Sequence, residues 1–218
     1  MTMTPKPEDI VGPGASIWSL VRAVVTVFFT EFPAHRDILR ATVPPHPREE
    51  PPMSIKTIED LFIHELSDIY SAEKQLTKAL PKLARASTSP ELKEAFESHL
   101  EETQGQVERI DQIVELLGIR LKRIKCAAME GLVEEGKEVI DGVEEGPLRD
   151  AALIGGGNKV EHYEIASYGT LAALAKQLGY TKAVPLLLET LVEEKAADEK
   201  LTMLSERLST QTQAEKAA

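Results

Sequence analysis

Acidic side chains stand at α-helical spacing among apolar ones near the end of the chain. In the segment "LVEEKAADEKLT" (191–202), Glu194 and Asp198 fall between two leucines at intervals of three or four residues, and so share one face of a helix. Two carboxylates therefore occupy positions that a helix normally gives to its core. Burying an unpaired carboxylate is costly, so such a face is exposed to water, paired with a cation or bound to a metal.

Three earlier segments also place polar side chains in the middle of an apolar helical stripe. If the segments pack side by side, these middles meet at one level. Carboxyl groups that meet in an apolar core repel one another unless they are protonated or bound to cations, and two divalent metals bridged by carboxylates would solve this problem. The polar residues of these stripes are Glu65, His99, Glu102, Gln106 and Glu161.

The same residues belong to a short internal repeat. The segment "LEETQGQVERI" (100–110) aligns with "VEEKAADEKLT" (192–202), and "ELSDIYS" (65–71) aligns with "EHYEIAS" (161–167). Asp68 and Glu164 lie at the edges of their stripes, so a supporting or surface role is as open for them as metal binding. The aligned pairs are Glu65 with Glu161, Asp68 with Glu164, Glu102 with Glu194, and Gln106 with Asp198.

The elements that must position these residues are four long helices. Apolar periodicity marks where these helices run. Ser89, followed by Pro90, is expected to cap the start of one helix, and Gly118 and Gly179 are expected to end two of them. Two links are short and make antiparallel hairpins, whereas the middle link is long enough to cross the bundle and holds an extra short helix. We predict an all-α, ferritin-like four-helix bundle. The predicted helices span about 54–80, 90–117, 149–178 and 181–208, with the extra helix around 126–141.

Composition limits the function. The 218-residue chain carries a formal charge of −11, which disfavours nucleic acid as a partner. Its 5% aromatic content is typical of helices packed on helices. Cys126 is the single cysteine, so no intrachain disulfide can form, and we expect a cytoplasmic protein.

Residues 1–53 differ from the rest, because they hold most of the 13 prolines. We predict a poorly ordered N-terminal extension, a bundle over 54–210 and a disordered tail over 211–218. The extension contains an apolar stretch, "ASIWSLVRAVVTVFFTEF" (15–32), which Arg22 interrupts. Three interpretations stay open for it: a poorly ordered or amphipathic extension, a membrane or export segment, or a start assigned upstream of the true one at Met53. No membrane partner is expected for the bundle.

Several long motifs identify a family. The segments "IEDLFIHELSDIYSAEKQL", "HLEETQGQ", "NKVEHYEIASYG" and "LVEEKAADEKL" occur in order, and over 54–210 the chain resembles the ferritin-like bacterial stress proteins of the YciF and YciE type. This resemblance implies a bundle similar to that of rubrerythrins, a homodimer, a role in stress responses and a di-iron site without a firmly assigned reaction.

Ferritin-like sites commonly take one Glu from each of two helices and a Glu-x-x-His pair from each of the other two. Glu65 and Glu161 match the single acids, and Glu102 and Glu194 match the Glu of the pairs. The histidine positions hold Gly105 and Ala197, which cannot bind a metal. The nearest substitutes are Gln106, Asp198 and, on one side only, His99. The predicted centre is oxygen-rich, with Fe or Mn as two ions, although such a site would suit Mg or Ca as well.

Three functions remain open. The first is oxidase or peroxide-detoxifying chemistry at a metal pair that meets O₂ or peroxide. The second is metal binding without catalysis. The third is a helical interaction protein with a degenerate metal site. The sequence does not decide whether the protein is an enzyme.

Overall fold

The structure is a computed structural model that describes residues 55–217, with the side chains described as far as Leu208. Its described residues are all helical apart from the links and contain no strand. The apolar stretch at 15–32 and the predicted N-terminal extension lie outside the described residues. The helices are α3 (Ile58–Ala86), α4 (Pro90–Leu117), α5 (Ala127–Gly142), α6 (Pro147–Gln177) and α7 (Ala183–Ala217).

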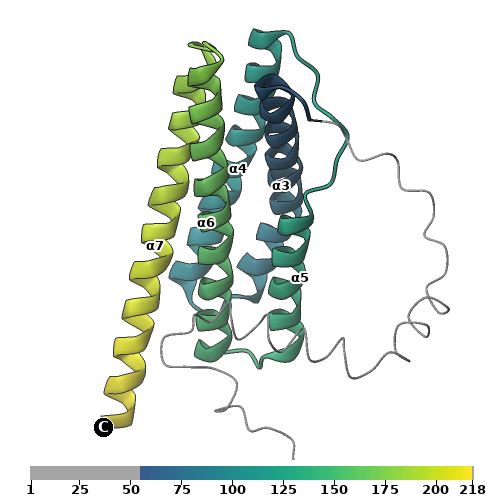
Figure 1. The fold of residues 1–218 in the computed structure, drawn as a ribbon. Helices are drawn as coiled ribbons and strands as arrows, with labels where there is room; N and C mark the ends of the chain where they lie inside the picture. The colour runs from purple at the N-terminus through teal and green to yellow at the C-terminus, as the bar shows by residue number, and fades with distance from the viewer. Residues whose placement is uncertain (1–54, 218) are drawn as a thin grey trace, which may run out of the picture. The chain divides into compact units, whose positions relative to one another are not determined.

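The four long helices form two antiparallel hairpins that pack on each other (Figure 1). α3 pairs with α4, and α6 pairs with α7, while α4 contacts α7 and α3 contacts α6. The long link after α4 returns along the bundle and carries α5, which packs against α3 and α6. The predicted all-α, ferritin-like bundle with a helix in its crossover is confirmed.

Local signals explain where the helices begin and end. Thr57 caps α3 in a reciprocal capping box with Asp60, whose backbone N–H donates to the Thr57 hydroxyl over 3.0 Å. Ser89 caps α4 as predicted, with Pro90 in the first turn. Gly118 ends α4 with a φ of 63°, in the left-handed region that glycine adopts without strain.

Two helices extend further than the sequence predicted. α3 continues through Pro81 to Ala86, because one missing N–H is offset by the packing of the next turn, where Ala84 is buried. α7 continues beyond Leu208 to Ala217. Its last residues include alanine, glutamate and lysine but no glycine or proline, so no local signal stops the helix.

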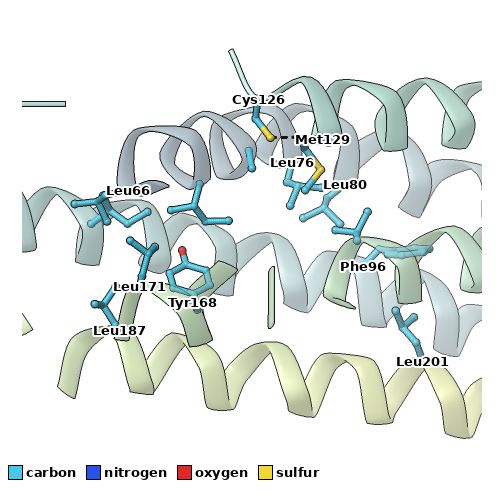
Figure 2. Close-up of a cluster of buried hydrophobic side chains, with 14 of the residues drawn as sticks. Leu66, Leu76, Leu80, Phe96, Cys126, Met129, Tyr168, Leu171, Leu187 and Leu201 are labelled. Atoms are coloured by element: carbon cyan, nitrogen blue, oxygen red, sulfur yellow. Dashed lines mark hydrogen bonds between the residues drawn. The ribbon is translucent and has the colours of Figure 1, made fainter. Parts of the chain in front are cut away.

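The core lies between the four long helices and under α5 (Figure 2). Each large apolar side chain that it buries contributes roughly 1.5–3 kcal/mol relative to exposure. Asp150 at the start of α6 is also buried, and its carboxylate accepts hydrogen bonds from the backbone N–H groups of Thr88 (2.8 Å) and Ser89 (2.7 Å). The beginning of the second hairpin is thereby fixed to the turn of the first. The largest fully buried side chains include Phe62, Leu66, Ile69, Leu76, Leu92, Ile110, Ile113, Met129, Leu153, Tyr168 and Leu171.

No helix in the described part of the chain is both long and apolar enough to cross a bilayer.

Candidate metal centre

Among the described residues, four buried side chains from three helices converge in the middle of the bundle. His99 comes from α4, Glu161 and Glu164 from α6, and Glu194 from α7. One potential ligand atom of each lies within 4.8 Å of those of the others. The Nε2 atom of His99 is 3.4 Å from an oxygen of Glu161 and 3.9 Å from an oxygen of Glu194. The geometry is that of a group that could surround a metal ion.

A further carboxyl group reaches this level from α3. Glu73 is completely buried, and the hydroxyl of Tyr168 donates a hydrogen bond to one of its oxygens. The other oxygen has no hydrogen-bond partner among the described residues. Burial raises the pKa of Glu73 to about 7. All four long helices therefore contribute to the polar level of the core.

The electrostatics favour either protons or a cation in this group. Burial raises the pKa of Glu161, Glu164 and Glu194, and the neighbouring carboxylates raise those of Glu164 and Glu194 further. Burial lowers the pKa of His99, but the charges of Glu161 and Glu102 outweigh burial and raise it overall. A divalent cation would remove the repulsion that these shifts reflect.

Unsatisfied oxygens give an independent test of whether a metal fits. Neither oxygen of Glu164 or of Glu194 has a hydrogen-bond partner within residues 55–208, and one oxygen of Glu161 is also unpaired. Buried polar atoms normally find partners, so this concentration of orphan oxygens needs an explanation. Carboxylate oxygens with a single imidazole form a donor set that suits Fe(II) and Mn(II). The residues present fit a metal.

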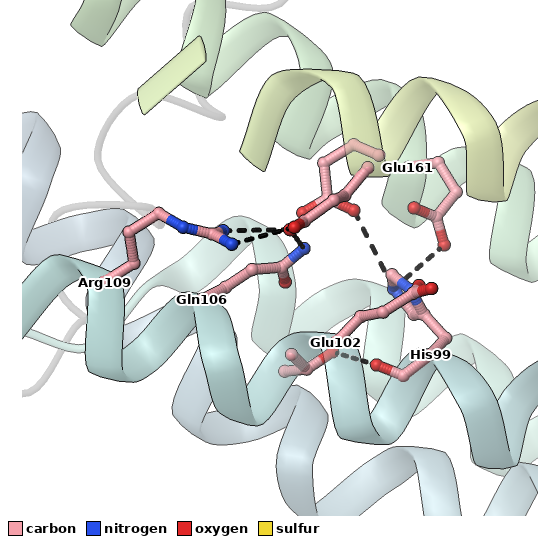
Figure 3. A network of polar contacts seen from close by, with 8 residues as sticks. His99, Glu102, Gln106, Arg109 and Glu161 are labelled. Carbon is pink, nitrogen blue, oxygen red and sulfur yellow. Dashed lines mark hydrogen bonds and ion pairs between the residues drawn. The ribbon is translucent and has the colours of Figure 1, made fainter. Parts of the chain in front are cut away.

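Glu102 orients the histidine from the rim of the group (Figure 3). Its side chain is 45% exposed and accepts a hydrogen bond from Nδ1 of His99 over 3.2 Å. This bond leaves Nε2 facing the carboxylates, and it lowers the pKa of Glu102. Such a carboxylate–histidine pair is the usual means of fixing a metal-binding imidazole.

A second polar network adjoins the group between α4 and α7. Arg109 donates to both oxygens of Glu193 (2.8 and 2.9 Å) and to the hydroxyl of Thr190 (2.6 Å). Gln106 is buried and donates its amide N–H to Glu193 over 3.1 Å. Figure 3 shows Gln106 lying between Arg109 and the histidine on α4. Because a carboxylate only accepts hydrogen bonds, this contact fixes which way the Gln106 amide is turned.

The residues predicted from sequence therefore divide into three sets. The structure brings His99, Glu161, Glu164 and Glu194 together, and it places Glu102 and Gln106 next to them. Three others lie elsewhere. Glu65 is only half-buried on α3. Asp68 accepts a hydrogen bond from the hydroxyl of Tyr163. Asp198 accepts a hydrogen bond from the amide of Asn158 over 2.7 Å and lies beside the exposed His162.

Glu65 was expected to face the core, but Glu73 does so instead. The buried stripe of α3 runs through Phe62, Leu66 and Ile69 and then reaches Glu73 after four more residues. The sequence contained this signal, since Glu73 stands four residues after Ile69 and three before Leu76. The internal repeat misled the prediction, because it aligned Glu65 with the buried Glu161, although the two helices present different faces to the core.

Two further features of α6 concern its core face. Tyr168 is buried there and donates a hydrogen bond to the carboxylate of Glu73. The glycine run at 155–157 serves close packing at one position, since a Cβ on Gly157 would lie 2.8 Å from Cδ1 of Leu201. Cys126, to which the sequence assigned no role, is buried and caps α5, with its sulfur 3.0 Å from the hydroxyl of Tyr163.

The fold and this buried group define a ferritin-like helical bundle with a candidate metal centre. The chain belongs to the family described as a domain of unknown function, DUF892, whose model matches residues 57–214. It is 66% identical over 154 residues to the protein YciF of Escherichia coli (strain K12), and the match covers 70% of this chain and 93% of that protein.

Solved structures agree with this assignment. The crystal structure of the E. coli stress protein YciF matches with a TM-score of 0.70 and 64% identity, covering 72% of this chain and 99% of that one. The protein YcfI from Rhodopseudomonas palustris matches with a TM-score of 0.67 and 45% identity, covering 70% and 98%. A protein from Xanthomonas campestris pv. campestris shares the fold, with a TM-score of 0.57 at 23% identity over 74% of this chain and all of its own.

Proposed function

We propose that this protein binds a pair of Fe or Mn ions in its core and uses them to consume peroxide or O₂. The observation that carries the proposal is the convergence of His99, Glu161, Glu164 and Glu194, with ligand atoms within 4.8 Å of one another and with unpaired buried oxygens. Glu73 would complete the set from α3.

The protein's own residues would hold and tune the metals. The Tyr168 hydroxyl holds one oxygen of Glu73 and leaves the other free for a cation. Glu102 keeps Nε2 of His99 directed at the carboxylates. The buried apolar side chains of Phe96 and Leu201 lie beside His99 and Glu161. When bound, Fe or Mn would supply the redox chemistry that none of these side chains supplies alone.

The link to stress comes from a relative. The E. coli protein that matches this chain is described as a stress protein. Removal of peroxide would suit such a role, and an oxygen-rich centre with one imidazole is compatible with it. A second candidate function is metal binding without turnover, which the presence of one histidine in place of the usual two favours.

The first experiment is elemental analysis of the full-length protein purified without added metal. We expect about two Fe or Mn per chain, the count of a carboxylate-bridged pair. Glu164→Gln and Glu194→Gln should lose most of this metal, whereas Glu65→Gln should retain it, because Glu65 lies outside the group. Equal metal content in all four proteins would refute core binding. Peroxide consumption by the loaded protein then separates catalysis from metal binding alone.

The homodimer implied by the family resemblance is also a proposal. Leu188, Val192 and Met203 are large apolar side chains exposed on α7, which a second copy could cover. Light scattering after size exclusion should give twice the chain mass of 24.0 kDa for the wild type. Val192→Glu should shift that mass toward the monomer if this face forms the interface.

A further inference from the structure

A small pocket opens between α4 and α7 beside the candidate metal centre. Its volume is about 90 Å³, and His99 and Glu161 of the centre line it. The exposed side chains of Glu102 and Lys200 line it too. Lys200 is near enough to Glu102 to contribute to the lowered pKa of that carboxyl group. The pocket therefore connects the buried imidazole with side chains that water reaches.

Ala197 accounts for part of the open space. It lies three residues after Glu194, and residues three apart stack on one face of a helix. In ferritin-like sites that contain a Glu-x-x-His pair, this position carries the histidine. Here the side chain is a methyl group, and it forms part of the pocket wall. The pocket thus lies where another protein of this fold would place a ligand of its own.

The equivalent position on α4 behaves differently. Gly105 lies three residues after Glu102, but it does not line the pocket, and a Cβ there would meet nothing within 4 Å. His99, on the preceding turn, supplies the imidazole of α4 instead. On α4, His99 therefore makes up for the missing histidine at position 105. On α7, no imidazole replaces the missing histidine at position 197, and the space beside Ala197 remains open.

We infer that this pocket is the position at which a small exogenous ligand reaches the metal centre, and that Ala197 sets the size of that ligand. The inference rests on the proposed function, since it needs a metal held by His99 and Glu161. A volume of about 90 Å³ is enough for several water molecules, since a cavity needs roughly 10–15 Å³ to hold one. Ligands the size of azide or hydrogen peroxide fit this space, and we expect aromatic carboxylates and organic hydroperoxides to be excluded from it.

The experiment is a ligand titration of the full-length protein loaded with Co²⁺, whose visible absorption reports changes in coordination. The ligands are azide and, as a larger anion, benzoate. Ala197→Leu fills the inner wall of the pocket. Ala196→Phe covers it from an exposed position of α7, so its folding does not depend on fitting a larger side chain into the core. Ala166→Leu, on the exposed face of α6, is the matched control.

We expect wild type and Ala166→Leu to bind azide and to ignore benzoate. In Ala197→Leu and Ala196→Phe the azide affinity should fall about tenfold or more while cobalt uptake is unchanged, because the added atoms occupy the ligand's space. Two results would overturn the inference and leave the proposed metal centre standing. The first is an undiminished azide response in both cobalt-loaded variants, and the second is a response of the wild type to benzoate that equals its response to azide. Failure of the wild type to take up cobalt would overturn the proposed metal centre, and this inference with it.

Discussion

The Nε2 atom of His99 on α4 lies 3.4 Å from a carboxylate oxygen of Glu161 on α6, the helix diagonally across the bundle, and both side chains are buried. Their contact joins the first hairpin to the second at the middle of the bundle. Because Glu164 and Glu194 add further carboxyl groups at this point, the centre of the fold is held at an electrostatic cost that a cation would remove.

Removal of one carboxyl group should therefore stabilise the metal-free protein. Glu164 is fully buried, and neither of its oxygens has a partner among the described residues. In Glu164→Gln at pH 8 with EDTA we expect the melting temperature to rise by about 2–8 °C, since an amide of the same shape carries no charge to desolvate. Thermal unfolding followed by circular dichroism measures this. Glu65→Gln should leave it unchanged, and a lower melting temperature for Glu164→Gln would contradict the argument.

The stability of the metal-free protein should fall as the pH rises. The pKa of Glu73 is raised to about 7 from an ordinary value of 4.5, so the unfolded chain releases this proton before the folded protein does. The resulting stabilisation is complete below pH 4.5 and is lost by about pH 7. The raised pKa values of Glu161, Glu164, Glu194 and His99 act in the same direction.

Urea denaturation in EDTA at pH 5.5 and pH 8 tests this dependence, with a lower midpoint expected at pH 8. Added Mn²⁺ should reverse the order, because a metal binds the deprotonated carboxylates. A midpoint that is equal at both pH values without metal would mean that the buried carboxyl groups are not protonated as proposed.

Arg109 should matter more for stability than an exposed arginine in an ion pair. Its side chain is 14% exposed and holds Glu193, whose carboxylate in turn fixes the Gln106 amide. We expect Arg109→Met to lower the free energy of unfolding by about 1–3 kcal/mol, since it leaves a partly buried carboxylate without its cation. Arg207→Met is the matched control, because Arg207 pairs with Glu91 in solvent and should contribute less than about 1 kcal/mol. Equal losses in urea denaturation would argue against a special role of Arg109.

Asp150 should be needed as a double acceptor. In Asp150→Asn the amide nitrogen cannot accept from a backbone N–H, so either Thr88 or Ser89 loses its partner. The expected loss is about 1–3 kcal/mol in the free energy of unfolding. Chemical denaturation measures this loss of stability. The control is Asp141→Asn at an exposed site, whose free energy of unfolding should stay near that of the wild type.

Two glycines of α6 should respond oppositely to alanine. Gly155→Ala should stabilise the protein by up to about 1 kcal/mol, because the helix gains propensity and the new Cβ meets nothing within 4 Å. Gly157→Ala should lose that gain, since its Cβ would lie 2.8 Å from Cδ1 of Leu201 and the leucine must shift. Because Leu201 lines the small pocket, azide binding by the cobalt-loaded protein should change only in Gly157→Ala. Stabilisation by both substitutions would show that Leu201 moves freely.

Local patterns were enough to predict the helices and their order. The caps at Ser89 and Gly118, the short links within each hairpin and the helix in the crossover all agree with the structure. The convergence of acidic side chains was also predicted, because each helix carries them at its middle. The prediction failed at the end of α3, which continues past the expected end near residue 80 to Ala86. The packing that stabilises these last turns cannot be recognised from the local sequence.

That carboxylates would meet in the core of a helical bundle could be predicted from the sequence alone, because period and polarity are properties of each segment. Which of the carboxylates meet depends instead on how the helices are turned toward one another in the folded protein. The rotation of α3 about its axis buries Glu73 and leaves Glu65 half-exposed, and the rotation of α7 buries Glu194 while Asp198 turns to Asn158. These rotations follow from how all four helices pack together, and so no single segment contains them.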